Sequence, residues 1–181
     1  VMGALFNLLL GLIIVDVILA PSEAFTSTVI AEFNENAVSQ ASGLQVDDKI
    51  VEVDGRKIFT TYDLSYAFTN VKDGKVDITV VRDGKATELT DVAFKTEEEN
   101  GISYMTVDFK VYGIEKTVGS YIKQTVKTAI SYCAVIWRSL LDMISGKYGI
   151  SAVSGPVGVT VAIADAAKAN LESLLPIMAL I

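Results

Sequence analysis

The chain has 181 residues, of which 51% are hydrophobic, and its mean hydropathy is +0.44 although 20% of its residues are charged. It contains no His and a single Cys, Cys133, which excludes a Ser-His-Asp triad, a Cys-His pair, a His-ligated zinc and an internal disulfide within this sequence. Its net charge of −7 argues against nucleic-acid binding, which depends on cationic contacts to phosphates.

The charge is unevenly distributed along the chain. Residues 22–120 contain 18 acidic and 10 basic side chains, a net charge of −8, whereas the remaining residues contain 4 acidic and 5 basic side chains, a net charge of +1. The sequence therefore predicts an acidic, water-exposed module between two apolar flanks.

The first flank is apolar from residue 2 to residue 20 except for Asn7 and Asp16. About 20 such residues in a helix cross a hydrocarbon core of ~30 Å. Residues 1–21 are therefore predicted to form a transmembrane helix. A signal peptide is the alternative, because small residues follow at Ala20, but the sequence lacks the basic segment that begins such peptides.

The second flank ends the chain in an apolar run over residues 171–181. This run is too short for a span and reads as the start of a further transmembrane helix. Since the chain also does not begin with Met, we expect it to be part of a longer polypeptide that is cut within two membrane helices.

The acidic middle has the pattern of short strands and turns. Asp83-Gly84 predicts a two-residue type I′ hairpin, because both central positions of that turn need positive φ. A short helix is predicted over residues 62–70 with Thr60 or Thr61 as its N-cap, and a further helical turn over residues 37–41. Predicted strands cover residues 28–33, 49–53, 76–80 and 85–89. The predicted fold class is α+β.

Residues 42–55 read Ser-Gly-Leu-Gln-Val-Asp-Asp-Lys-Ile-Val-Glu-Val-Asp-Gly. This run resembles the signature of bacterial PDZ domains, Gly-Leu-x-x-Gly-Asp-x-Ile-x-x-Val-x-Gly, with Asp47 where the second Gly is usual. The resemblance implies a PDZ-like β-sandwich or barrel over residues 22–116, flanked by transmembrane and membrane-surface helices.

A PDZ groove binds an extended peptide along a strand edge, while apolar pockets select its side chains. By resemblance, the groove would lie between the strand at residues 28–33 and the helix at residues 62–70. The alternative is that the apolar side chains of these two segments fill the core of the domain itself. The candidate groove residues are Val29, Ile30, Leu64 and Phe68.

Apolar residues recur close to the helical period from residue 118 to residue 144, with most charged residues on the other side. A second span and a core helix of a soluble domain are two readings of this pattern. The cationic face and the single Trp, Trp137, favour an amphipathic helix on the membrane surface over residues 117–147.

A loop with the sequence Ser-Gly-Pro-Val-Gly-Val and a helix of small residues follow within residues 148–170. Together with the other segments, they resemble the region between the second and third membrane helices of bacterial site-2 proteases. These are intramembrane zinc metalloproteases that cleave anti-sigma factors. The family's Gly-Pro-x-x-Asn motif matches Gly3 to Asn7, with Ala4 in place of Pro.

The resemblance implies a multi-pass protease of the bacterial inner membrane that performs regulated intramembrane proteolysis. Its PDZ domain would lie on the extracytoplasmic side as a substrate filter or peptide reader. The expected partners are the lipid bilayer and a transmembrane substrate similar to an anti-sigma factor. In this family, zinc is held by a His-Glu-x-x-His helix and by an Asp-Gly motif, and the matching positions fall before residue 1 and after residue 181.

Consequently, no catalytic residue and no metal ligand is predicted within this chain, and zinc is expected only in the parent protein. Gly3 and Asn7 are the residues expected near the active site. The competing hypothesis is a membrane-anchored PDZ binding module without catalysis. A PDZ-bearing serine protease would need a His or Lys partner for its nucleophile, which neither Ser42 nor Ser154 has in the sequence.

Overall fold

A computed structural model describes residues 2–69, 71, 73–99, 102–145, 163, 164, 166–168 and 175. Apart from those isolated positions, the segments predicted at 148–170 and 171–181 lie outside the described residues. The chain divides into two compact units. We call Ala24–Glu115 the sheet unit, and Val1–Glu23 with Lys116–Ile181 the helix unit.

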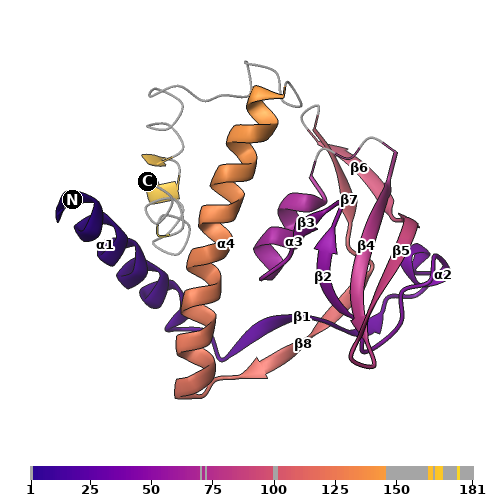
Figure 1. The fold of residues 1–181 in the computed structure, drawn as a ribbon, viewed down its shortest axis with the longest axis horizontal. Coiled ribbons are helices and arrows are strands. Elements are labelled where there is room, and N and C mark those ends of the chain that lie inside the picture. Colours follow the sequence, from indigo (N-terminus) through magenta and orange to yellow (C-terminus); the bar gives the residue numbers. More distant parts are fainter. Residues whose placement is uncertain are drawn as a thin grey trace. The chain divides into compact units, whose positions relative to one another are not determined.

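In the helix unit, α1 (Met2–Leu19) packs against α4 (Val118–Ile144) (Figure 1). In the part of the chain that the structure describes, no helix combines the length and the apolar character needed to cross a membrane. Residues 2–19 thus form the expected helix, but the structure does not confirm the transmembrane helix predicted over residues 1–21.

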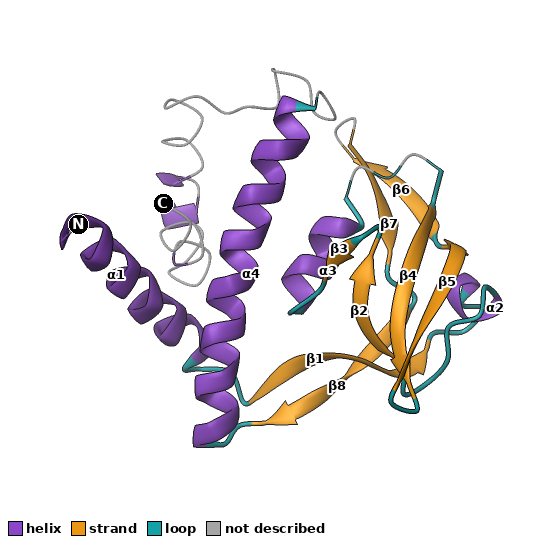
Figure 2. Ribbon diagram, viewed as in Figure 1, coloured by secondary structure: helices purple, strands orange, loops and turns teal. Residues whose placement is uncertain are grey.

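The sheet unit consists of antiparallel strands with two short helices, which agrees with the predicted α+β class (Figure 2). Its main sheet has the order β5-β4-β2-β1-β8, β3 pairs with β2, and β6 and β7 form a separate hairpin. The strands are β1 (Ala24–Phe33), β2 (Lys49–Val53), β3 (Arg56–Lys57), β4 (Lys75–Arg82), β5 (Lys85–Ala93), β6 (Lys95–Glu99), β7 (Ile102–Thr106) and β8 (Phe109–Glu115). The helices are α2 (Val38–Ala41) and α3 (Thr61–Ala67).

The first and last residues of the sheet unit are partners in one strand pair. Ala24 at the start of β1 is in register with Glu115 at the end of β8. The chain therefore enters and leaves this unit at the same end of a two-stranded ribbon.

The hairpin between β4 and β5 confirms the turn prediction. Asp83 and Gly84 have φ of 50° and 75°, and Arg82 pairs with Lys85 on either side of them. Both turn residues are therefore in the left-handed region that a type I′ turn requires.

Helix α3 begins as predicted, with Thr60 as its N-cap. The buried carboxylate of Asp63 accepts hydrogen bonds from the backbone N–H groups of Phe59 and Thr60, each at 3.0 Å. Since these bonds satisfy donors that precede the first helical turn, they fix the start of the helix. The helix ends at Ala67, before the predicted end at residue 70.

The core of the sheet unit lies between the main sheet and α3. Leu64 in the middle of α3 and Phe68, the C-cap that follows it, are 4% and 2% exposed. The Phe68 ring lies 4.7 Å from that of Phe94, and the Phe94 ring 6.4 Å from that of Phe109, measured between ring centroids. The core therefore connects the end of α3 to strand β8 through aromatic rings in tilted and edge-to-face contact.

We predict that Leu64→Ala lowers the free energy of unfolding of the sheet unit by about 2–5 kcal/mol, because it removes a buried side chain and leaves a cavity. Ser65→Ala, an exposed change in the same helix, should alter it by less than ~0.5 kcal/mol. Both changes in unfolding free energy are measured by urea unfolding, with amide hydrogen exchange in β2 and β4 as the readout for the sheet unit. A Leu64→Asp variant that stays folded and loses only peptide binding would contradict the core assignment.

Candidate functional site

Strand β8 is the last strand of the main sheet, and β1 lies inside it. Backbone hydrogen bonds of 2.9 Å join Ile30 of β1 to Asp47 and Asp48 at the start of β2, and β8 pairs with the other edge of β1. In the described residues, the edge strand on this side of the sheet is thus β8. This differs from the expectation that a peptide would bind along residues 28–33.

The structure brings three of the four candidate groove residues together. Ile30, Leu64 and Phe68 are buried in one hydrophobic cluster, with Ile30 fully inaccessible. Val29 is half-buried and belongs to the other face of β1, because successive side chains of a strand alternate between faces. Three of the side chains therefore lie in the core, and their part in peptide binding stays a prediction.

The loop over residues 43–48 is held by a buried ion pair. The Asp48 carboxylate is fully inaccessible and contacts Nε and Nη2 of Arg82, each at 2.7 Å. Arg82 Nη2 also donates to the carbonyl of Gly43 at 2.9 Å, and Asp48 accepts from the N–H of Gln45 at 2.9 Å. The hydrogen bond to Asp48 raises the pKa of Arg82 above its ordinary value. The guanidinium thereby joins the two ends of the loop to strand β4.

Asp47, at the position where the resemblance expects a glycine, has a left-handed backbone conformation. Its φ is +70°, in the left-handed region that Asp tolerates better than most residues. Its carboxylate accepts a hydrogen bond of 3.0 Å from the hydroxyl of Tyr112 on β8, and this bond raises the pKa of the phenol. Asp47 therefore forms the left-handed turn of the loop and contacts the edge strand.

The beginning of β8 is fixed by a second buried carboxylate, that of Asp108. It accepts hydrogen bonds from the backbone N–H and the hydroxyl of Ser39 in α2, the former at 3.0 Å. The Asp108 carbonyl accepts from the N–H of Asn34 at 2.8 Å. Sequence reasoning missed Asp108, Arg82 and Tyr112, because an isolated Asp, Arg or Tyr carries no pattern that shows its partner.

Gly3 and Asn7 lie one turn apart near the start of α1, and both are exposed. Farther along this helix, Asp16 binds α4 twice. Its carboxylate accepts from the Thr125 hydroxyl at 2.7 Å, and its carbonyl accepts from the Tyr121 hydroxyl at 2.6 Å. These contacts fix the pairing of α1 with α4. The role of Gly3 and Asn7 near an active site stays a prediction.

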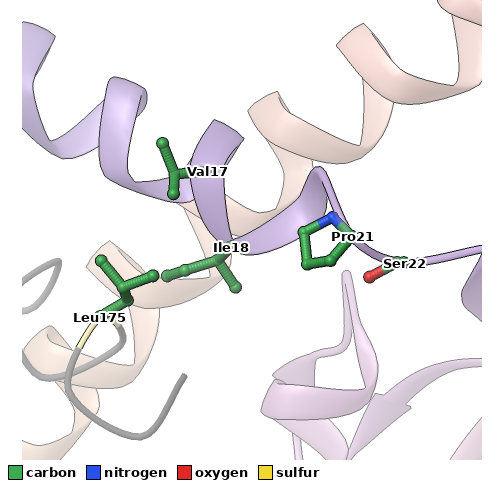
Figure 3. Close-up of a pocket in the computed structure, with 5 residues that line it drawn as sticks. All are labelled: Val17, Ile18, Pro21, Ser22 and Leu175. Carbon is green, nitrogen blue, oxygen red and sulfur yellow. The ribbon is translucent and has the colours of Figure 1, made fainter. Parts of the chain in front are cut away.

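A pocket of about 320 Å³ lies at the end of α1 (Figure 3). Among the described residues that line it, four have apolar side chains and Ser22 has a hydroxyl group. The lining residues are Val17, Ile18, Pro21, Ser22 and Leu175.

The residues that the structure describes form no candidate zinc site. The chain contains no His, and among the residues described by the structure no group of three or more Cys, Asp and Glu could hold a metal ion. A catalytic zinc commonly has three protein ligands.

Comparison with known proteins places the chain in a family. The profile of peptidase family M50 matches residues 1–181. The chain belongs to this family of site-2 proteases. A related protein from Geobacillus kaustophilus, zinc metalloprotease RasP, is 26% identical over 176 residues, which cover 96% of this chain and 41% of RasP.

Two further relatives carry provisional names as zinc metalloproteases. The protein from Staphylococcus aureus strain MSSA476 is 27% identical over 188 residues, covering 99% of this chain and 43% of the relative. The protein from Clostridium perfringens is 28% identical over 179 residues, covering 98% and 52%. The M50 chain described here thus spans about half or less of the length of these relatives.

The ion pair generates a prediction for this M50 chain. Arg82→Met should lower the free energy of unfolding of the sheet unit by about 3 kcal/mol, because it leaves the buried Asp48 carboxylate without its cation. Adding Asp48→Asn should restore part of the loss, since the uncompensated charge is then gone. Urea unfolding of the single and double variants measures this. Equal urea midpoints for Arg82→Met and the unmodified chain would show that the ion pair does not hold the loop.

Proposed function

We propose that this chain is the central part of a membrane-associated zinc metalloprotease whose metal ligands lie in segments outside residues 1–181. The match of family M50 to the whole chain carries this proposal. The absence of His from the chain is consistent with it, because the resemblance to bacterial site-2 proteases places the zinc ligands in flanking segments.

We further propose that the sheet unit is a PDZ-like peptide reader or substrate filter, and that β8 is the strand to which a peptide adds. Strand addition needs an unpaired edge, and β8 ends the main sheet whereas β1 is paired on both sides. Two side-chain contacts hold this strand. One is the hydrogen bond from Tyr112 to Asp47 of loop 43–48, and the other is the bond that Asp108, just before the strand, accepts from Ser39. A rigidly held edge lowers the entropy cost of binding an extended chain.

The charge of the sheet unit limits which segments would bind. Residues 24–115 contain 17 acidic and 9 basic side chains, a net charge of −8. On β8 itself, Lys110 is paired with Glu32 of β1. An extended segment that is neutral or basic therefore suits this edge better than an acidic one. In the proposed protease, the segment would belong to a transmembrane substrate, similar to an anti-sigma factor, that undergoes regulated intramembrane proteolysis.

The protease proposal predicts where zinc is held. The complete protein, purified in detergent, should contain about one zinc per chain and cleave a model transmembrane substrate, and a chelator should abolish cleavage until zinc is returned. A protein limited to residues 1–181 is the matched control and should retain no zinc. Metal analysis and a cleavage assay test this. A complete protein without zinc and without cleavage would favour the non-catalytic PDZ binding module instead.

The reader proposal predicts peptide contact at β8. A photo-crosslinking phenylalanine analogue in place of Tyr112, which is 44% exposed, should capture basic peptides more than acidic ones. The same analogue in place of Glu88, an exposed residue of β5 at the opposite edge of the sheet, is the control. Mass spectrometry of the products measures both. Equal capture at the two edges would contradict the assignment of β8.

A further inference from the structure

The end of α1 is held by the beginning of α4 (Figure 1). The hydroxyl of Tyr121 donates to the carbonyl of Asp16 at 2.6 Å, and the hydroxyl of Thr125 donates to its carboxylate at 2.7 Å. Tyr121 and Thr125 are four residues apart and therefore lie one turn apart on the same side of α4. One residue of α1 is thus bound at two heights along its partner helix. We call Asp16, Tyr121 and Thr125 the helix clamp.

Lys116, just before α4, binds the last carbonyl groups of α1. Its ammonium donates to the carbonyls of Leu19, at 3.5 Å, and of Ala20. It also lies 5.4 Å from the centre of the Tyr121 ring. The last carbonyls of a helix have no partner within the helix and form the negative end of its dipole, so a cation there is stabilising. Because α1 has no basic residue in its last turn, Lys116 supplies this charge and supports the helix clamp.

Asp16 is the single ionisable residue of α1, and Asn7 is the other polar one. Burying part of a carboxylate in such an apolar helix is unfavourable unless hydrogen bonds compensate for the lost water. Asp16 is half-buried, and Thr125 provides such a bond. Burial and the charge of Asp16 raise the pKa of Tyr121, so its hydroxyl keeps its proton and remains a donor at neutral pH. The helix clamp therefore accounts for the presence of a carboxylate in α1.

The helix clamp also fixes how α1 is rotated about its own axis. From Asn7 to Asp16 the chain advances nine residues. At about 100° per residue, this advance turns the helix by ~900°, or two and a half turns. Asn7 therefore projects from the side of α1 opposite Asp16, and it is exposed. Because Asp16 is bound to α4, the helix clamp sets the direction in which Asn7 points.

Thr128 provides a comparison on the same side of α4. It is 1% exposed, and its hydroxyl has no hydrogen-bond partner among the residues that the structure describes. Thr125 is 8% exposed and lies three residues earlier, within about 60° of Thr128 around the helix. The two threonines therefore have similar burial but differ in one bond, the one from Thr125 to Asp16.

We propose that Asp16 is a positioning residue of the proposed protease, and that its bonds to Tyr121 and Thr125 hold α1 in the rotation that catalysis requires. This inference rests on the function proposed above, and Asn7 is the residue of α1 expected near the active site. Asp16 acts through the orientation of α1 and not by contact with the reacting atoms. A displacement of about 1 Å caused far from the chemistry can lower a rate about a hundredfold, so one interhelical bond is sufficient for such a role.

Cleavage of a model transmembrane substrate by the complete protein in detergent tests the positioning role. Thr125→Val removes the hydroxyl and nearly keeps the shape of the side chain. It should lower kcat about tenfold and leave KM within about twofold, because the helix clamp does not bind substrate. Thr125→Ser keeps a hydroxyl and should retain kcat within about twofold of the unmodified protein. Thr128→Val is the matched control and should cleave like the unmodified protein.

A second variant shows whether the bond itself matters. Asp16→Ala should lower kcat by about the same factor as Thr125→Val, and the double variant should lower it no further, because both changes remove the same bond. In the chain of residues 1–181, Thr125→Val should speed amide hydrogen exchange about fivefold at Ala20, whose N–H donates to the Asp16 carbonyl. Thr128→Val should leave that exchange unchanged.

The experiment separates failure of the positioning role from failure of the proposed function. A complete protein that holds no zinc and cleaves nothing overturns the protease proposal, and the positioning role with it. If the complete protein cleaves and Thr125→Val cleaves equally fast, the positioning role alone is overturned. It is also overturned if Thr125→Val loses its zinc together with its activity, because that result indicates a collapsed structure and not a rotated helix.

Discussion

The Asp48 carboxylate is buried without access to water, and Arg82 supplies the charge that makes this burial stable. The guanidinium reaches from β4 to the carboxylate and to the carbonyl of Gly43, so one side chain closes the loop over residues 43–48. That loop presents Asp47 to the hydroxyl of Tyr112, which adds a side-chain bond to the backbone pairing of β8 with β1. The ion pair is thus linked through the loop to the edge strand.

The two units follow opposite rules of burial. The sheet unit buries an apolar cluster beneath α3 and exposes most of its described carboxylates, with Asp48, Asp63 and Asp108 as the buried exceptions, as expected for a protein in water. In the helix unit, α4 joins α1 through polar contacts and exposes its apolar side chains. A family of membrane proteases is a context in which both rules can apply to one chain, because its members meet water and lipid at once.

Local signals predicted the elements of the sheet unit better than its edges. Asp83-Gly84 predicted the β4–β5 turn, and Thr60 the start of α3, because these conformations depend on neighbouring residues only. The strand at 109–115 was not predicted, and its place beside β1 depends on pairing between distant residues. The candidate groove residues were selected by apolar character, which core and pocket share. The partners of Asp108 and Arg82 lie far away in sequence and leave no local trace.

The pairing of Ala24 with Glu115 bears on how the whole chain can fold. Because the two ends of the sheet unit meet, this unit is in topological terms an insertion into the connection between α1 and α4. Once the ribbon of β1 and β8 has formed, the connection between the two helices is effectively a short one, and the entropy cost of closing it is correspondingly small. The helices can therefore form a pair almost as if they were neighbours in sequence.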